Sequence, residues 1–294
     1  MTIAILVSDI TANDYADIFQ EVVGHLNGNL NSLEQVDVLT LKPINQVEQL
    51  NEALATTYSC LRHQFTEAGC DYKLGITILF NTGVSKITPG TQKVYVSKDI
   101  EEHIKVDYSI QKLESEPRTI ERQIAPKISK KYNVSALGGT FDHIHDGHKI
   151  LLSVAAFLAK RKLIIGITGQ ALLKNKKYAE CLESFEVRMK RTIALVNRLL
   201  DGNVRYDVYE INDVCGPTGF VKDIDCLVVS EESAKGGAYV NNYRNERGFP
   251  SLDIITIKVV GGEDSREDNS WKGKISSTDI REYIYKETYK SNST

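Results

Sequence analysis

The regular alternation of strand-like and helix-like segments after residue 133 is the feature that most restricts the fold of this chain. Short apolar runs such as 163–168 (LIIGIT) and 225–230 (DCLVVS) are typical of strands buried on both faces. Longer amphipathic segments lie between them, of which 183–200 is the clearest. This alternation predicts a parallel sheet covered by helices on both faces. Such a sheet binds its ligand beyond the carboxyl ends of its strands, where the strand order reverses.

The same patterns predict the remaining elements and the domain boundaries. The second half is expected to add strands at 134–137, 204–211 and 254–260 and helices at 148–161, 238–247 and 277–289. The first half is expected to contain strands at 3–7, 36–41, 74–80 and 94–97 and helices at 14–27 and 45–68. Because segment 112–132 is charged and contains Pro117 and Pro126, it is typical of a connection between folded units. We therefore predict an N-terminal α/β domain of unknown role (1–115), a linker (116–132) and a parallel-sheet α/β domain (133–294).

Composition excludes several classes of protein. The chain has 294 residues, of which 41% are hydrophobic and 26% charged, as in an average soluble globular protein. A net charge of −3 argues against a nucleic-acid partner. Neither a membrane-spanning run nor a secretory signal is recognisable, so we expect no membrane partner and a cytoplasmic location, with nuclear presence left open. The five cysteines have no CxxC spacing, which favours reduced thiols.

Three of the six histidines fall in segment 140–148 (TFDHIHDGH), between an expected strand and an expected helix. Gly138 and Gly139 precede the segment and allow close approach of a ligand to the backbone. The helix start offers unpaired N–H groups to an anion, and histidine rings can donate hydrogen bonds to phosphate. The segment therefore predicts a phosphate site for a nucleotide.

Two other interpretations of this segment were considered. The histidines could simply cap the helix and fill a loop. Alternatively, Asp142, His143 and His145 could open a metal site like that of some barrel metallohydrolases. That site needs further histidines from later strands, and none follows His148.

Two later segments carry further phosphate-binding chemistry. In segment 274–281 (KISSTDIR), Ser276 or Ser277 is a natural N-cap with Asp279 in the first turn, which by itself indicates only a well-capped helix. The flanking cations Lys274 and Arg281 would, however, suit a polyphosphate at that helix start. Segment 172–177 (LLKNKK) follows the expected strand 163–168, and Lys174 is its favoured phosphate ligand.

His145-Asp-Gly-His148 and Ile275-Ser-Ser-Thr278 together resemble the HxGH and ISST-like motifs of the nucleotidyltransferase α/β-phosphodiesterase superfamily. A narrower resemblance, to the eukaryotic and archaeal type of phosphopantetheine adenylyltransferase, is carried by the sequences of segments 138–142, 148–152, 227–232 and 274–278. The resemblance covers about residues 133–287. It implies a Rossmann-like nucleotidyltransferase domain, preceded by a second, smaller α/β domain. It also implies the transfer of AMP from ATP to 4′-phosphopantetheine, giving dephospho-coenzyme A and pyrophosphate in coenzyme A biosynthesis.

The resemblance also assigns roles to residues. His148, His145 and Lys174 form the catalytic set, with His148 stabilising the transition state; Thr140 and Lys174 hold the attacking phosphate. Mg²⁺ is expected with ATP, held by phosphates and water and without a protein metal site. The ATP site would comprise Gly139, Thr140, Phe141, His145, His148, Ser230, Glu231, Asn241, Ile275, Ser276, Ser277, Thr278 and Arg281.

Further expectations concern partners and alternatives. The chain contains no GxxxxGK[ST] segment, so a separate dephospho-coenzyme A kinase is expected, together with association with other enzymes of the pathway. Segment 261–270 is expected to order over bound ATP as a lid. A related cytidylyltransferase is the main alternative, but those typically carry an RTxGIST-type second motif, whereas 273–278 reads GKISST. An inactive, ligand-binding descendant is a further alternative, against which the two intact motifs count.

Overall fold

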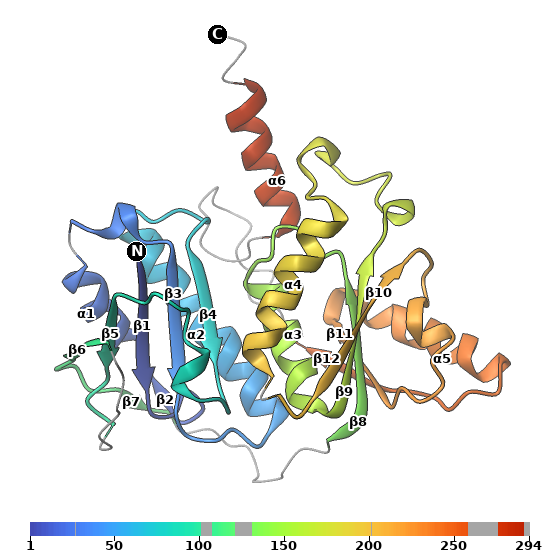
Figure 1. The fold of residues 1–294 in the computed structure, drawn as a ribbon, viewed down its shortest axis with the longest axis horizontal. Coiled ribbons are helices and arrows are strands. Elements are labelled where there is room, and N and C mark those ends of the chain that lie inside the picture. The colour runs from blue at the N-terminus through green and yellow to red at the C-terminus, as the bar shows by residue number, and fades with distance from the viewer. Residues whose placement is uncertain (27, 101–107, 121–130, 201, 258–275, 291–294) are drawn as a thin grey trace. The chain divides into compact units, whose positions relative to one another are not determined.

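The computed structural model describes residues 1–26, 28–100, 108–120, 131–200, 202–257 and 276–290 (Figure 1). They form two compact units, unit 1 from the residues up to 120 and unit 2 from 131–257 and 276–290. Each unit is built on a five-stranded parallel sheet, which confirms the predicted α/β class. The predicted lid 261–270, together with Lys274 and Ile275, lies outside the described residues.

Unit 2 is a doubly wound sheet with the strand order β10-β9-β8-β11-β12. From β8 the chain moves outward through β9 to β10 and then returns to the other side of β8 for β11 and β12. The strand order therefore reverses between β8 and β11, which is where such sheets bind ligands. The elements are β8 (Tyr132–Gly139), α3 (Asp146–Leu158), β9 (Ala159–Thr168), η3 (Gln170–Leu172), η4 (Ala179–Cys181), α4 (Phe185–Leu199), β10 (Arg205–Ile211), η5 (Gly216–Gly219), β11 (Cys226–Ser230), η6 (Glu231–Ser233), α5 (Ala234–Glu246), β12 (Asp253–Ile257), α6 (Ser277–Tyr285) and η8 (Lys286–Lys290).

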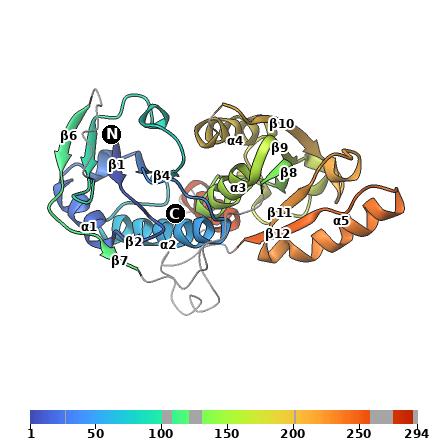
Figure 2. The same ribbon diagram turned by 90° about the horizontal axis from the view of Figure 1, so that it is seen from below.

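Both faces of this sheet are covered by helices. Ala136, Ile164 and Leu227 point to the face on which Val240 of α5 packs. Their neighbours along each strand point to the opposite face, because side chains alternate in a strand. Helices α3 and α4 cover that opposite face, as the view along the sheet shows (Figure 2). This arrangement leaves the carboxyl ends of the strands free to carry a site.

The element boundaries follow the predictions closely, with one informative difference. The helix expected at 148–161 ends at Leu158, and the basic residues after it belong to β9. The start of β9 pairs with both neighbouring strands, Ala159 with Tyr132 of β8 and Lys162 with Arg205 of β10. This pairing overrides the local helix preference. Gly248 follows α5 with a positive φ of 68°, the left-handed conformation that glycine favours after a helix.

Unit 1 repeats this organisation with the strand order β4-β3-β1-β5-β6, again fully parallel. The short strand β6 was not predicted, because its Ser-Ile-Gln-Lys sequence is largely exposed and has little hydrophobic pattern. The elements of unit 1 are β1 (Thr2–Val7), β2 (Asn13–Asp14), α1 (Ala16–His25), η1 (Leu30–Ser32), β3 (Gln35–Thr40), α2 (Val47–Glu67), β4 (Gly75–Leu79), η2 (Val84–Lys86), β5 (Lys93–Val96), β6 (Ser109–Lys112) and β7 (Arg118–Thr119).

Three further observations bear on the sequence-based expectations. Residues 116–120, predicted to begin the linker, are part of unit 1, where β7 pairs with β2. All five cysteines are free, as expected. Within the described parts of the chain, no helix has the length and apolar character needed to cross a membrane.

Candidate functional site

The loop after β8 brings the first histidine motif to the amino end of α3. Phe141 and His143 both adopt left-handed backbone conformations, with φ of 50° and 43°, so the loop folds tightly on itself. The Phe141 ring is fully buried and lies 5.3 Å from the ring of His148. A Cβ atom at Gly139 would meet this ring at 3.2 Å, which explains the glycine. Phe141, predicted to bind ATP, is therefore a buried support for His148.

His145 and His148 form a stacked pair at the start of α3. His145 is the N-cap residue, and the ring centroids lie 4.0 Å apart with an interplanar angle of 30°. Burial of the ring, followed by the influence of His145 and of Lys149, holds the pKa of His148 well below its ordinary value. His148 is thus a neutral imidazole at pH 7, able to donate a hydrogen bond.

We expect this protonation state to be visible by NMR. An unperturbed histidine titrates near pH ~6.5. The ring signals of His148 should instead stay those of the neutral form as the pH is lowered from 7.5 to below ~6.5. The signals are assigned by their loss in a His148→Gln variant. Because the unfolded chain takes up this proton near pH ~6.5 and the folded chain does not, His148 lowers folded-state stability as the pH falls below that value. A titration of His148 at the unperturbed pH would contradict the assignment.

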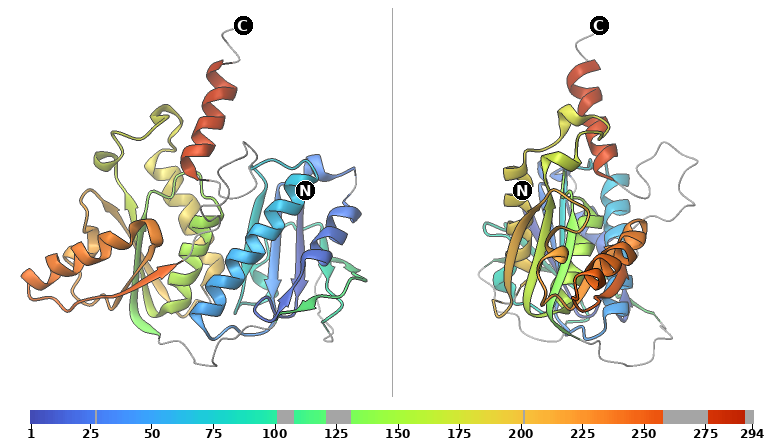
Figure 3. Two further views of the ribbon diagram at one scale, coloured as in Figure 1. Left: turned by 180° about the vertical axis from the view of Figure 1, so that it is seen from behind. Right: turned by 90° about the vertical axis from the view of Figure 1, so that its right-hand side faces the viewer.

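Helix α6 brings the second motif to the same loop, although it lies more than 130 residues away in sequence. Ser276, one of the two predicted N-cap residues, caps α6 and forms a reciprocal capping box with Asp279 of the first turn. The Ser277 hydroxyl donates to the backbone carbonyl of Asp142 at 2.8 Å. Helix α6 therefore starts beside the histidine loop and extends from the edge of unit 2 where the strands end (Figure 3). Two helix N-termini meet at one place, which suits a polyphosphate.

Arg281, predicted as a phosphate ligand, has a different role in the structure. Its side chain is only 2% exposed, and its Nη1 donates to the fully buried Asp142 carboxylate at 2.5 Å. Its Nε donates to the carbonyl of Lys177 at 3.0 Å, and its Nη2 to the Thr278 hydroxyl at 3.1 Å. Arg281 thus joins α6 to two loops of the site, and its guanidinium is used internally.

The remaining predicted residues divide into two groups. Thr140 directly follows β8, Ser230 and Glu231 stand at the carboxyl end of β11, and Lys174 lies in the segment after β9, so all four belong to the same edge of the sheet. Asn241 does not share this arrangement. Its amide donates to the carbonyl of Leu252 at 3.0 Å and accepts from the Leu252 N–H at 2.8 Å. Asn241 therefore holds the loop before β12, and the structure does not support its assignment to the adenosine pocket.

Arg188 is a residue of the site that the sequence analysis missed. It is fully buried, and its Nη1 donates to the carbonyls of Thr140 and Thr168 at 2.7 and 2.8 Å, across the ends of β8 and β9. Its Nε donates to the carbonyl of Glu183. All three acceptors are backbone carbonyls, and those of Thr140 and Thr168 come from segments 48 and 20 residues away, so no side-chain motif marks this arginine in the sequence.

His143, which had no predicted role, anchors the same loop from the other side. Its Nε2 lies 2.8 Å from the carbonyl of Cys181, and its backbone N–H donates to the Glu183 carboxylate at 2.8 Å. The Glu183 N–H in turn donates to Asp142 at 2.9 Å. Asp142 thus orders the loop, with one carboxylate oxygen accepting from Glu183 and the other from Arg281.

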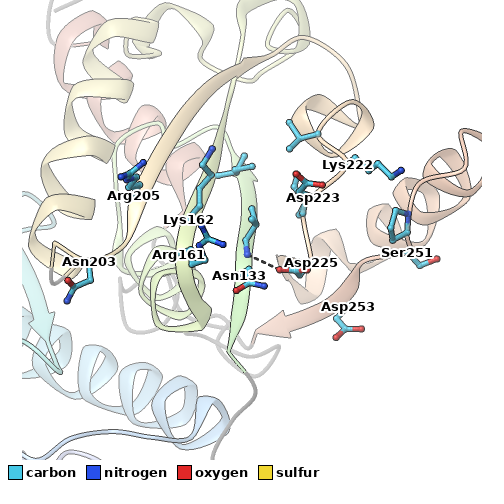
Figure 4. A pocket seen from close by; sticks show the side chains of 15 residues that line it. Asn133, Arg161, Lys162, Asn203, Arg205, Lys222, Asp223, Asp225, Ser251 and Asp253 are labelled. Carbon is cyan, nitrogen blue, oxygen red and sulfur yellow. Dashed lines mark hydrogen bonds between the residues drawn. The ribbon is translucent and has the colours of Figure 1, made fainter.

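A separate groove lies at the opposite edge of unit 2, where the strands begin (Figure 4). Arg161, Lys162 and Arg205 lie along the starts of β9 and β10, across from Asp223 and Asp225 on the other side of the groove. Lys162 pairs with Asp207 at 2.7 Å. None of the predicted site residues lines this groove. The chemistry of the two motifs therefore belongs to the carboxyl edge alone.

Comparison with known proteins agrees with this geometry. Residues 136–283 match the cytidylyltransferase-like family. The phosphopantetheine adenylyltransferase of Saccharomyces cerevisiae is 38% identical over 85% of this chain and 83% of its own length. The chain belongs to the phosphopantetheine adenylyltransferase family. The phosphopantetheine adenylyltransferase of Thermococcus gammatolerans is 38% identical over 52% of this chain and 89% of its own length, and that of Methanothermobacter thermautotrophicus is 36% identical over 52% and 86%.

Membership in the phosphopantetheine adenylyltransferase family confirms the predicted nucleotidyltransferase fold and the predicted enzyme activity. The match to the Thermococcus protein spans 152 residues, close to the length of unit 2. The Saccharomyces protein, in contrast, matches over 259 residues, more than unit 2 contains. The roles of individual site residues stay predictions.

Proposed function

We propose that the chain transfers AMP from ATP to 4′-phosphopantetheine at the carboxyl edge of unit 2, between the amino ends of α3 and α6. The observation that supports this most directly is the contact of the two motifs through Ser277, Arg281 and Asp142. The two helix starts offer N–H groups and positive dipole ends to two polyanionic substrates, which would otherwise repel each other. The reaction releases pyrophosphate and dephospho-coenzyme A.

The proposed mechanism needs no covalent intermediate. A phosphate oxygen of 4′-phosphopantetheine attacks the α-phosphorus of ATP in line, and the bond from that phosphorus to the oxygen bridging to the β-phosphorus breaks. The attacking phosphate is already ionised near pH 7, so no general base is required. Neutral His148 donates a hydrogen bond to the phosphoryl oxygens as negative charge builds up, and His145 contacts the same phosphates. Lys174 and Thr140 position the attacking phosphate, while Ser276, Ser277 and Thr278 hold the departing pyrophosphate.

The remaining partners belong to the same proposal. Mg²⁺ accompanies ATP and neutralises phosphate charge when bound, held by phosphates and water. Among the residues described, no group of three or more His, Cys, Asp or Glu side chains that could hold a metal is found. We further propose a cytoplasmic location and a separate kinase that phosphorylates the product, dephospho-coenzyme A.

The proposed substrates can be tested by measuring pyrophosphate release. Turnover is expected with ATP and 4′-phosphopantetheine and not with phosphocholine or glycerol 3-phosphate. Lys174→Ala is expected to raise KM for 4′-phosphopantetheine about tenfold and to leave KM for ATP nearly unchanged. A tenfold change corresponds to about 1.4 kcal/mol of binding free energy, the loss expected for one charge-assisted hydrogen bond. Lys190→Ala, an exposed lysine of α4, is the matched control. Equal turnover with glycerol 3-phosphate would contradict the substrate assignment.

Unit 2 alone is expected to fold and to retain adenylyl transfer. Its five strands form one sheet with its own core, and both motifs lie within it or at its border. A fragment beginning at residue 131 should therefore be soluble and show a kcat within a few-fold of that of the full chain. An insoluble fragment, or a soluble one that binds no ATP, would mean that unit 1 completes the core or the site.

A further inference from the structure

Unit 1 has the same topology as the catalytic unit. If the strands of each sheet are numbered by their order within the unit, both sheets read third-second-first-fourth-fifth, and all strands are parallel. The connections also correspond: α1 matches α3, α2 matches α4, and the short η2 after the third strand matches η5. From this correspondence we infer that unit 1 is a second, non-catalytic copy of the transferase fold, whose ligand crevice is filled by its own chain. The inference rests on the proposed location of the site in unit 2.

The catalytic rings have no equivalents in unit 1. Each first helix begins after the first strand, and the N-cap residue is His145 in α3 and Tyr15 in α1. The third helical residue is His148 in α3 and Ile18 in α1. Ile18 is fully buried and carries no hydrogen-bonding group. The pair of imidazoles that serves the phosphates in unit 2 is thus replaced by a phenol and an alkyl side chain.

Tyr15 occupies the place where a ligand would lie. Its hydroxyl accepts from the N–H of Asp9, just after the first strand, at 2.8 Å. The same hydroxyl donates to the carboxylate of Asp99, just after the fourth strand, at 2.6 Å. Tyr15 is only 3% exposed, and burial together with Asp99 raises the pKa of its hydroxyl, which keeps the donated proton in place. One side chain therefore bridges the ends of the two strands between which the order reverses.

The segment after β6 closes this region from outside. Leu113, at its start, donates its N–H to Val96 at the end of β5, and Ile120, at its end, donates to Ala12 after β1. Between them, the N–H groups of Glu114 and Ser115 donate to the Glu21 carboxylate of α1 at 3.0 and 2.8 Å. We call residues 113–120 the strap. It runs from the end of the fifth strand, where it bonds to the fourth, to the loop after the first strand, and its Ile120 lines the same small pocket as Tyr15.

Charge at the start of α1 also excludes a polyphosphate. The Asp14 carboxylate accepts from the N–H of Ala16 at 2.9 Å, so it occupies one of the unpaired N–H groups of the helix start. Asp17 pairs with Arg118 of the strap at 2.7 Å. Both helices carry one acidic residue in the first turn, Asp17 in α1 and Asp146 in α3, but α1 also has the Asp14 carboxylate bonded to its start, where it disfavours an anion. Unit 1 therefore keeps the fold without the paired imidazoles and with added negative charge at this helix start.

Hydrogen exchange of the full chain, with and without a non-hydrolysable ATP analogue and Mg²⁺, tests this inference. We expect slow exchange at residues 8–20 and 113–120 that the nucleotide does not change. Nucleotide protection at 8–20, or two nucleotides bound per chain by calorimetry, would overturn it. Protection at 138–149 tests the proposed function separately: its absence would contradict the ATP site in unit 2 without changing the result for unit 1.

Variants of the strap test the closure itself. Arg118→Ala is expected to speed exchange at 113–120 and 8–20 at least several-fold, because it removes the pair with Asp17, while pyrophosphate release stays unchanged. Lys73→Ala, which removes an exposed ion pair with Asp71 at 3.9 Å far from the strap in sequence, is the control and should leave this exchange unchanged. Fast exchange at 113–120 in the unsubstituted protein, unaltered by Arg118→Ala, would show that the crevice of unit 1 is open and would overturn the inference.

Discussion

His148→Ala is expected to lower kcat by ~10²–10³-fold while leaving KM for both substrates within a few-fold. The neutral ring lies at the start of α3, against His145 and Phe141, where the proposed mechanism has it donate to charge that develops in the transition state. Loss of one such preorganised donor typically costs this factor in rate. Because the contact strengthens only in the transition state, ground-state binding changes little. Steady-state pyrophosphate release over a range of both substrates measures both constants.

A matched control separates the chemistry from general damage. His63→Ala removes an exposed histidine of α2 in unit 1 and should leave kcat and KM unchanged. The His148→Ala protein should keep its far-ultraviolet circular dichroism spectrum. Near-normal turnover of this variant would show that His148 serves only the packing of the loop.

Arg281→Met is expected to destabilise unit 2 by ~3–5 kcal/mol, the usual cost of removing one partner of a buried ion pair. The substitution leaves the Asp142 carboxylate, which is fully buried, without its cation. It also removes the hydrogen bond to the carbonyl of Lys177, so the bond from Ser277 to the Asp142 carbonyl must hold α6 at the site with less support. Urea unfolding followed by circular dichroism measures the loss, and the fragment beginning at residue 131 gives a single unit for that measurement.

A double-variant cycle identifies the cause. Asp142→Asn combined with Arg281→Met should be less destabilised than the sum of the single variants, because the second change removes the stranded charge. Arg247→Met, an exposed arginine that lies over the ring of Tyr243, is the matched control and should cost less than ~1 kcal/mol. A stable Arg281→Met protein with a greatly raised KM for ATP would restore the original prediction that Arg281 binds phosphate.

Local patterns in the sequence were sufficient for the architecture of unit 2 and for the location of its chemistry. Apolar runs and amphipathic segments predicted its strands and helices, because burial on both faces of a parallel sheet demands them. The N-cap of α6 was predicted as Ser276 or Ser277, since capping acts through bonds within a few residues. The two motifs were recognisable for the same reason: each is a short segment at one helix start.

Only the tertiary structure decided which charged side chains face the site and which stabilise it from within. In the sequence, Arg281 and Arg188 cannot be told from surface arginines of a helix, yet both are buried. Besides the nearby Thr278, Arg281 bonds to partners 104 and 139 residues away. Besides the nearby Glu183, Arg188 bonds to partners 20 and 48 residues away. Such contacts depend on how loops from separate strands meet, which no local pattern encodes. The shared strand order of the two units emerged in the same way, because hydrogen bonds between strands distant in sequence set it. The sequence by itself determined the elements and the two motifs, whereas the packing of distant segments determined the orientation of each side chain.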